Sequence, residues 1–183
     1  MTAHGDAVRG AGDARAIQVH VLVAADTPAI RAALAGARLG ACVDAARDAL
    51  RQAMARLALG RTAAVALVVA DDAYLHALNH RYRGLDRPTD VLSFRSADGA
   101  PFPTGGAAAR HDLGDIVVSL PYAARSAAAR QAPLVDEMRL LAVHGLLHLL
   151  GHDDADDAGA ARMRAEEVRL GVRAPDDEAA VDG

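Results

Sequence analysis

The sequence contains no lysine, and all 20 of its basic residues are arginine. Chemistry that needs a lysine amine, such as Schiff-base formation or a Walker-type phosphate loop, is therefore excluded. Tryptophan is also absent, and aromatic residues make up 3% of a chain that is 52% hydrophobic, so the core must be built from Ala, Leu and Val. The 183 residues suffice for one domain with a sizeable core.

Cysteine is almost absent as well. Because Cys42 is the single cysteine, it forms no intramolecular disulfide and anchors no cysteine-rich zinc site. The net charge of −4 argues against a generally basic nucleic-acid binder, although it does not exclude a local basic patch. No apolar run approaches about 18 residues, and residues 1–16 lack an apolar leader segment. We therefore expect a cytoplasmic protein with no membrane partner.

Hydrophobic periodicity and turn residues predict an α+β fold. Strands are expected at residues 17–23, 63–70, 91–94 and 113–120. Helical segments are expected at 27–59, interrupted at Gly36 and Gly40, and at 72–83, 121–132, 133–150 and 155–170. This order of elements predicts a mixed sheet of about four strands packed by helices.

A single domain without internal repeats is expected. Residues 1–16, rich in Gly and small polar residues, predict a disordered tail. Residues 17–172 form the expected folded domain, and residues 173–183 form an acidic C-terminal tail.

The segment from Asp136 to Asp154 predicts a buried metal-binding helix, because it is apolar nearly all round and carries two histidines. His144 and His148 are four residues apart, which places them on one helical face with their Cβ atoms about 5–6 Å apart. Both imidazoles are then within reach of one cation, as in zinc sites. The alternative interpretation is a pair of core histidines bonded to the backbone.

A third ligand cannot come from the same straight helix, because His152 would lie about 12 Å of rise beyond His144. Gly151 follows the last apolar residue and predicts a left-handed helix end. The turn can return His152, Asp153 or Asp154 to the metal.

The residue after the first histidine also matters. In zinc peptidases the helix reads His-Glu-x-x-His, and the Glu is the base that activates the metal-bound water. Here Gly145 follows His144, so the helix lacks the peptidase base. A peptidase-like hydrolase is therefore disfavoured.

Four arginines form a local basic cluster in an otherwise acidic chain: Arg81, Arg83, Arg87 and Arg95. One interpretation is a solvated helix end, since charge runs usually face water. The other is phosphate recognition, because the planar guanidinium matches phosphate oxygens.

Three blocks of the sequence follow one another in a recognisable order. The first block runs from Leu78 to Phe94 and includes Tyr82-Arg83 and Pro88-Thr89-Asp90-Val91-Leu92-Ser93-Phe94. The second is Leu113-Gly114-Asp115-Ile116-Val117-Val118-Ser119, and the third is His144-Gly145-x-Leu147-His148-Leu149-x-Gly151. Together they resemble the YbeY family of metal-dependent endoribonucleases, the rRNA maturation factors of bacteria.

The resemblance implies a zincin-like metal helix in a single-strand-specific endoribonuclease that acts in rRNA maturation and ribosome quality control. It implies one zinc ion per chain, an RNA substrate, and ribosomal or small-subunit protein partners. It also implies a catalytic role for Arg83, facing the metal across a cleft. The general base stays unassigned, since a turn bond or a strand-end cap explains Asp90 and Asp115 equally well. The alternative function is a ribosome-associated binding factor whose metal is structural or absent.

The chain departs from the family pattern at the third ligand. The pattern places a histidine where this chain has Asp154, and commonly a tyrosine where it has His152. We predict His144, His148 and Asp154 as the ligands, with His152 as the alternative third ligand. Zinc accepts a carboxylate oxygen, and the harder donor also admits another divalent metal such as manganese.

Overall fold

The computed structural model describes residues 17–24, 27–34, 38–60, 62–96 and 111–173. The tails expected at 1–16 and 173–183 lie outside these residues, apart from Arg173, as does the helix interruption expected at Gly36.

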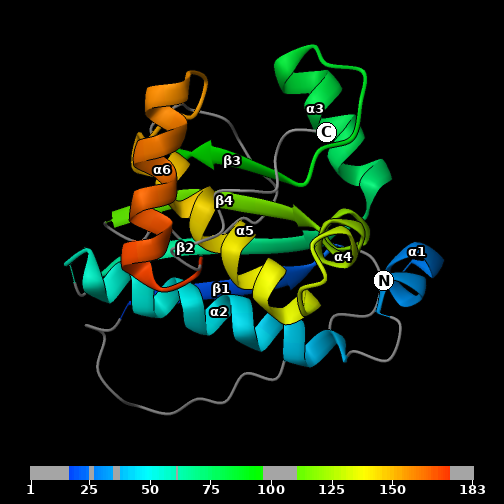
Figure 1. Cartoon of the computed structure of the whole chain (residues 1–183), viewed down its shortest axis with the longest axis horizontal. Helices are drawn as coiled ribbons and strands as arrows, with labels where there is room; N and C mark the ends of the chain where they lie inside the picture. The colour runs from blue at the N-terminus through cyan, green and yellow to red at the C-terminus, as the bar shows by residue number, and fades with distance from the viewer. Residues whose placement is uncertain (1–16, 25–26, 35–37, 61, 97–110, 174–183) are drawn as a thin grey trace.

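The described strands form one four-stranded mixed sheet in the order β1-β2-β4-β3 (Figure 1). Their bounds are β1 Gln18–Val23, β2 Ala63–Ala70, β3 Val91–Arg95 and β4 His111–Ser119. The β1–β2 and β2–β4 pairs are parallel, whereas β3 runs antiparallel to β4 and forms an edge of the sheet. The predicted α+β class and mixed sheet are confirmed.

Helices connect and cover the strands. Their bounds are α1 Pro28–Ala33, α2 Leu39–Arg56, α3 Asp72–Arg83, α4 Leu120–Ala129, α5 Leu134–Leu149 and α6 Asp157–Leu170. The helical region expected at 27–59 does form two pieces, α1 and α2, but α2 begins at Leu39, so Gly40 lies in its first turn and does not interrupt it. At that exposed end the extra backbone freedom of glycine is tolerated more easily than in a helix interior.

Local signals fix the bounds of α3, the helix that carries Arg83. The side chain of Asp71 accepts a hydrogen bond from the backbone N–H of Tyr74 at 3.0 Å and caps the first turn. Gly84 ends the helix with φ +69°, a left-handed conformation that favours glycine. Arg83 is thus the last residue of the helix.

The core has two parts because β2 is buried along its whole length. Leu67 and Val69 belong to the main cluster, which α2 and α5 complete on one face of the sheet. Val68 and Ala70 lie in a smaller cluster with Leu75 of α3 on the other face. The side chains alternate with period two, so a strand buried on both faces reads as a continuous apolar run.

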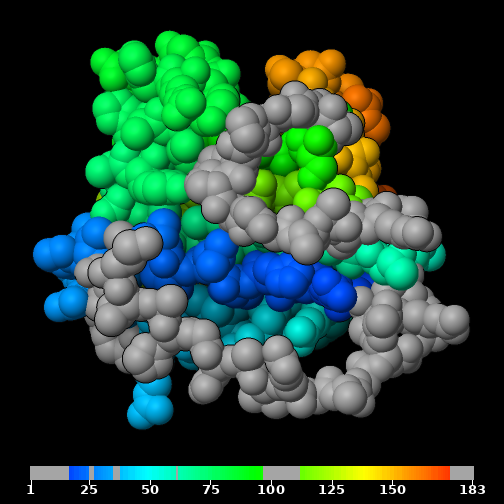
Figure 2. Space-filling model, turned by 180° about the vertical axis from the view of Figure 1, so that it is seen from behind, coloured from blue at the N-terminus to red at the C-terminus, as the bar shows by residue number. Residues whose placement is uncertain are grey.

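Figure 1 shows α2, α5 and α6 on one face of the sheet, with α3 beside the β3 edge. From behind, Figure 2 shows two lobes that rise at this edge, one green from the α3 region and one orange from the α6 region. None of the described helices is both long and apolar enough to cross a membrane.

Candidate metal site and its cleft

The two histidines of α5 lie on one helical face and point their Nε2 atoms at each other. These atoms are 3.0 Å apart, and the ring centroids are 4.6 Å apart at an interplanar angle of 80°. His144 and His148 therefore present two imidazole nitrogens to one point, as the four-residue spacing predicts.

The other nitrogen of each ring is held by a fixed partner. Nδ1 of His144 lies 2.7 Å from Oε1 of Glu167, and Nδ1 of His148 lies 3.1 Å from the carbonyl oxygen of His152. A carbonyl oxygen can only accept, so Nδ1 of His148 is the donor. Nε2 of His148 is then left with a lone pair, and each ring is oriented as in histidine metal ligands.

Glu167 connects His144 to a third residue. Its side chain is 1% exposed, and its Oε2 accepts a hydrogen bond from Nε of Arg173 at 2.6 Å. Burial raises the pKa of this carboxyl, but the hydrogen bonds from His144 and Arg173 outweigh burial, so the pKa lies below its ordinary value. The sequence shows Glu167 only as a residue at helical spacing, because its partners are known only from the fold.

The two imidazoles differ in basicity. Burial lowers the pKa of His144, but the hydrogen bond and charge of Glu167 outweigh it, so the pKa is raised. Burial lowers the pKa of His148, and the neighbouring His144 and Arg83 charges lower it further. The two imidazoles thus differ in how readily each gives up a proton, and a metal ion would need the deprotonated Nε2 of both.

Asp154 brings a carboxylate to the same point. Its Oδ2 lies 3.5 Å from Nε2 of His144, and its Oδ1 lies 3.6 Å from Nε2 of His148. The donor atoms of these three residues all lie within 4.8 Å of one another. Two imidazoles and one carboxylate form a donor set suited to zinc and to similar divalent metals.

The turn after α5 explains why Asp154 rather than His152 reaches this point. Gly151 has φ +96°, and its N–H donates to the His148 carbonyl at 3.0 Å. The N–H of His152 donates to the Leu147 carbonyl at 3.0 Å, which completes a Schellman motif. The backbone of His152 is thus fixed by the turn and supports His148, while its side chain lies outside the three-residue group.

A glycine in α6 holds the loop that carries Asp154. A Cβ on Gly159 would lie 2.2 Å from the Asp153 carbonyl oxygen, so the first turn of α6 packs directly on this loop. The N–H of Gly159 also donates to Oδ1 of Asp156 at 2.6 Å, which caps the helix. Only a residue without a side chain fits at this contact.

Gly145 stands at the position that the glutamate base occupies in zinc peptidases, and it faces the sheet. A Cβ there would lie 2.5 Å from Cγ2 of Ile116 and 3.1 Å from Oγ of Ser93. The hydroxyl of Ser93 donates to the Gly145 carbonyl at 2.9 Å. A carboxylate side chain therefore has no space at this position and would point away from the metal ligands.

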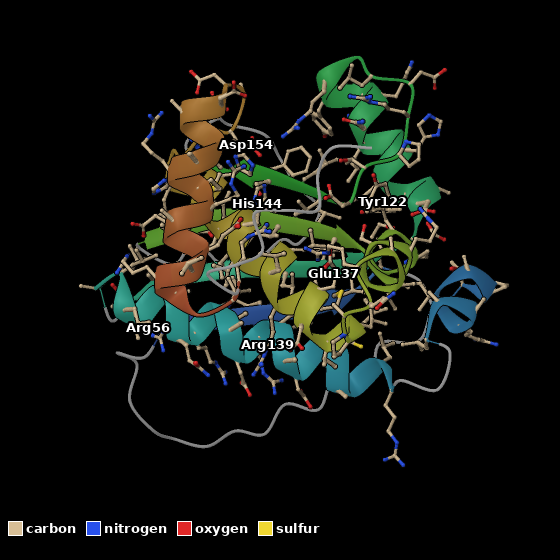
Figure 3. The ribbon with its side chains drawn as sticks, viewed as in Figure 1. Arg56, Tyr122, Glu137, Arg139, His144 and Asp154 are labelled. Atoms are coloured by element: carbon tan, nitrogen blue, oxygen red, sulfur yellow. The ribbon has the colours of Figure 1, made fainter. Side chains whose placement is uncertain are left out.

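A cleft of about 320 Å³ opens beside the histidines. Figure 3 places His144 and Asp154 between α6 and the β3 edge. The cleft is lined by Arg83, Ser93, Arg95, His148, Gly151, His152 and Asp153. Arginines from α3 and β3 thus share a cavity with a histidine of the metal group.

The two cleft arginines differ in their attachment. Arg95 donates from Nε and Nη2 to the His148 carbonyl, at 3.2 and 2.9 Å, and so holds the end of α5. Arg83 is exposed and forms no hydrogen bond or ion pair with a side chain in the described ranges. Its guanidinium lines the cleft, where it can contact a ligand.

The remaining residues of the basic cluster and the two aspartates lie elsewhere. Arg81 stacks over the Tyr82 ring, 5.2 Å from its centroid. Oδ1 of Asp90 accepts the N–H of Val91 at 2.8 Å, which is the turn bond. Asp115 lies within β4, opposite Phe94 of β3. None of these residues lines the cleft, but the charge of Asp90 contributes to the raised pKa of His144.

Comparisons with known proteins settle the relationship. A family model described as Endoribonuclease YbeY matches residues 38–173. This chain belongs to the YbeY family. The resemblance seen in the three sequence blocks is thereby confirmed.

Individual YbeY proteins agree. Endoribonuclease YbeY of Pelotomaculum thermopropionicum is 46% identical over 111 residues, which cover 61% of this chain and 72% of that protein. Endoribonuclease YbeY of Halorhodospira halophila is 45% identical over 112 residues, covering 61% of this chain and 70% of that protein. The solution structure of TM1509 from Thermotoga maritima aligns with a TM-score of 0.53 at 20% identity, covering 84% of this chain and 86% of that chain. This likeness concerns the fold alone.

Proposed function

We propose that the protein is a metal-dependent endoribonuclease that cleaves single-stranded RNA in rRNA maturation and ribosome quality control. Membership of a family whose relatives are named Endoribonuclease YbeY supports the reaction class. The observation that carries the proposal is the convergence of the His144, His148 and Asp154 donors beside a cleft that contains Arg83.

The proposed ligands are His144, His148 and Asp154, holding one zinc ion per chain, with manganese as another candidate metal. Both imidazoles have Nδ1 engaged, so Nε2 is the atom that each offers. The bound metal would supply Lewis-acid polarisation of a phosphoryl oxygen and acidification of a water.

The proposed catalytic residue is Arg83. Its guanidinium lines the same cleft as His148, where it would pair with phosphate oxygens of the substrate and offset charge that develops on them. Among the described cleft residues, the side chains that can accept a proton and lie outside the donor group are His152 and Asp153. One of these two residues is therefore the proposed general base that activates the attacking water.

The close packing of Gly145 against Ile116 and Ser93 argues against the peptidase alternative, because a glutamate side chain does not fit there. The RNA substrate, the ribosomal or small-subunit partners and the cytoplasmic location are parts of the same proposal. The competing role of a ribosome-associated binding factor with a structural or absent metal predicts no RNA turnover, which the following experiment measures.

The experiment determines metal content per chain and cleavage of a single-stranded RNA for the parent protein, Asp154→Ala and His152→Ala. We expect about one zinc per parent chain, loss of metal in Asp154→Ala, and retention in His152→Ala. Loss of metal in His152→Ala instead would assign the third ligand to His152. A zinc-loaded parent that leaves single-stranded RNA intact would refute the nuclease proposal and favour the binding factor.

A further inference from the structure

A second cavity, of about 420 Å³, lies along α5 on the side of its N-terminus. Leu140, which lines it, is four residues before His144 and thus about one helical turn away on the same face. The cavity shares no lining residue with the metal-site cleft. It is therefore a separate feature that adjoins the metal helix.

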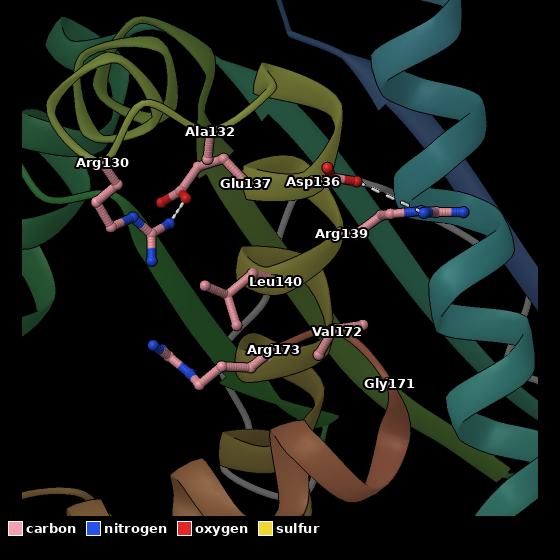
Figure 4. Close-up of a pocket in the computed structure, with 9 residues that line it drawn as sticks. All are labelled: Arg130, Ala132, Asp136, Glu137, Arg139, Leu140, Gly171, Val172 and Arg173. Carbon is pink, nitrogen blue, oxygen red and sulfur yellow. Dashed lines mark ion pairs between the residues drawn. The ribbon is translucent and has the colours of Figure 1, made fainter. Parts of the chain in front are cut away.

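Two guanidinium groups face this cavity from opposite ends. Figure 4 shows Arg130, which follows α4, and Arg173, which follows α6, approaching from two sides with Leu140 between them. Arg139 also belongs to the lining, but its side chain extends along the other side of α5 toward α2, where it pairs with Asp136 at 3.6 Å.

Both arginines retain donors. Arg130 pairs with the buried Glu137 through Nη2, while its Nε is buried without a hydrogen-bond partner among the described residues. Arg173 uses Nε on Glu167 at 2.6 Å. A guanidinium has five N–H groups in a planar fork, so each of these arginines keeps N–H donors that pair with no described residue.

The charges at this cavity balance. Arg130 pairs with Glu137, Arg139 with Asp136 and Arg173 with Glu167, so an anion would be held by the spare N–H donors rather than by a net charge. Leu140 and Val172 add apolar surface beside the guanidinium groups. This combination suits a phosphate ester. The guanidinium groups can bind the charged phosphate oxygens, and the apolar side chains can pack against the less polar part of the ester.

We propose that this cavity binds a phosphate group between Arg130 and Arg173. The phosphate belongs either to a free nucleotide or to an RNA strand that extends along α5 from the metal site. The second source rests on the proposed nuclease function, whereas the first does not. A cavity of this volume accommodates a nucleotide-sized ligand.

The proposed site is linked to the metal site by a short chain of contacts. Arg173 donates to Glu167, and Glu167 contacts Nδ1 of His144. A phosphate on Arg173 would thus lie two hydrogen-bonded contacts from a metal ligand. If the two sites are coupled, zinc and phosphate must alter each other's affinity by the same factor.

The test titrates 5′-AMP, and separately a short single-stranded RNA, into zinc-loaded protein by calorimetry at low salt. Arg130→Gln combined with Glu137→Gln removes the pair together, so no buried charge is left alone. We expect this double variant to bind at least about tenfold more weakly, because a charge-assisted contact is lost. Arg51→Gln, on the exposed side of α2, is the matched control and should bind as the parent does.

The outcomes separate the two sources. AMP binding that depends on Arg130 identifies a free-nucleotide site, and RNA binding that depends on Arg130 without AMP binding identifies the strand. Equal affinities in the double variant and the parent would overturn the proposal. Binding that Asp154→Asn weakens and the double variant does not would place the phosphate on the metal and also overturn it. Neither titration measures cleavage. The test of this phosphate site therefore stands even if the proposed nuclease function is refuted.

Discussion

Oε1 of Glu167 in α6 lies 2.7 Å from Nδ1 of His144 in α5, which fixes the imidazole from behind. Glu167→Gln keeps an oxygen at this position but removes its charge. We expect zinc affinity to fall about 10–100-fold, as for other residues that orient metal ligands. Competition with a chromophoric chelator measures the change.

The neighbouring residue supplies the control for this prediction. Glu166 pairs with Arg169 on the surface at 2.6 Å, so Glu166→Gln should bind zinc as the parent does. Equal zinc affinity in Glu167→Gln and the parent would show that Glu167 does not support the metal site.

Arg83 should act on RNA and not on the metal. Replacing it with alanine removes the guanidinium from the cleft, so we expect the cleavage rate to fall about 10²–10³-fold with zinc content unchanged. Arg81→Ala serves as the control, since Arg81 stacks on Tyr82 and does not line the cleft. Single-turnover cleavage of a single-stranded RNA measures both variants; similar losses in the two would argue for general charge attraction instead.

Gly145 should tolerate no side chain. In Gly145→Ala the new Cβ would lie 2.5 Å from Cγ2 of Ile116, so we expect the free energy of unfolding to fall by about 1–3 kcal/mol. Gly40→Ala places the same methyl group in open space on α2 and should stabilise by up to about 1 kcal/mol. Urea denaturation compares the two, and a stabilised Gly145→Ala would disprove the close contact.

Asp72 should make stability depend on pH. Burial raises the pKa of its carboxyl, but hydrogen bonds from Arg125 at 2.8 Å and Ser119 at 2.5 Å outweigh burial, so the pKa is lowered in the folded state. The resulting stability is present above the unfolded pKa of about 3.9 and is lost as the pH falls through the lower folded value. Asp72→Asn should therefore cost about 1 kcal/mol at pH 7 and progressively less below pH 4.

Denaturation of parent and variant between pH 2 and pH 7 follows this difference. Asp157 occupies the same first-turn position in α6 and pairs with no side chain that the structure describes, so Asp157→Asn is the control and should cost less stability at pH 7 than Asp72→Asn does. A constant gap between Asp72→Asn and the parent across the range would contradict the assignment.

Local patterns predicted the elements whose ends are set by nearby residues. The strand predicted from the apolar run Ala63–Ala70 has the same two ends as β2. Asp71 and Gly84 likewise mark the limits of α3. The strand expected from Leu113 begins earlier, at His111, because polar residues at a strand end resemble a loop in sequence. Such ends depend on pairing with a distant strand, here β2.

The site divides in the same way. The helical spacing of His144 and His148 is a local property, and the Gly151 turn signals that the chain returns. The support of His144 by Glu167, 23 residues away, arises only when α6 packs against α5. Likewise, nothing near Arg95 in sequence indicates that its guanidinium holds the His148 carbonyl.

Gly145 also bears on how this scaffold can change its chemistry. The backbone of α5 rests on Ser93 and Ile116 there, so a single substitution that recreates the His-Glu-x-x-His pattern would lift the helix and displace both histidines. Redesign toward peptide hydrolysis would have to introduce its base from the opposite wall, around the end of α3. In the proposed enzyme the helix would supply the place for a cation, and the wall that faces it would determine which bond is broken.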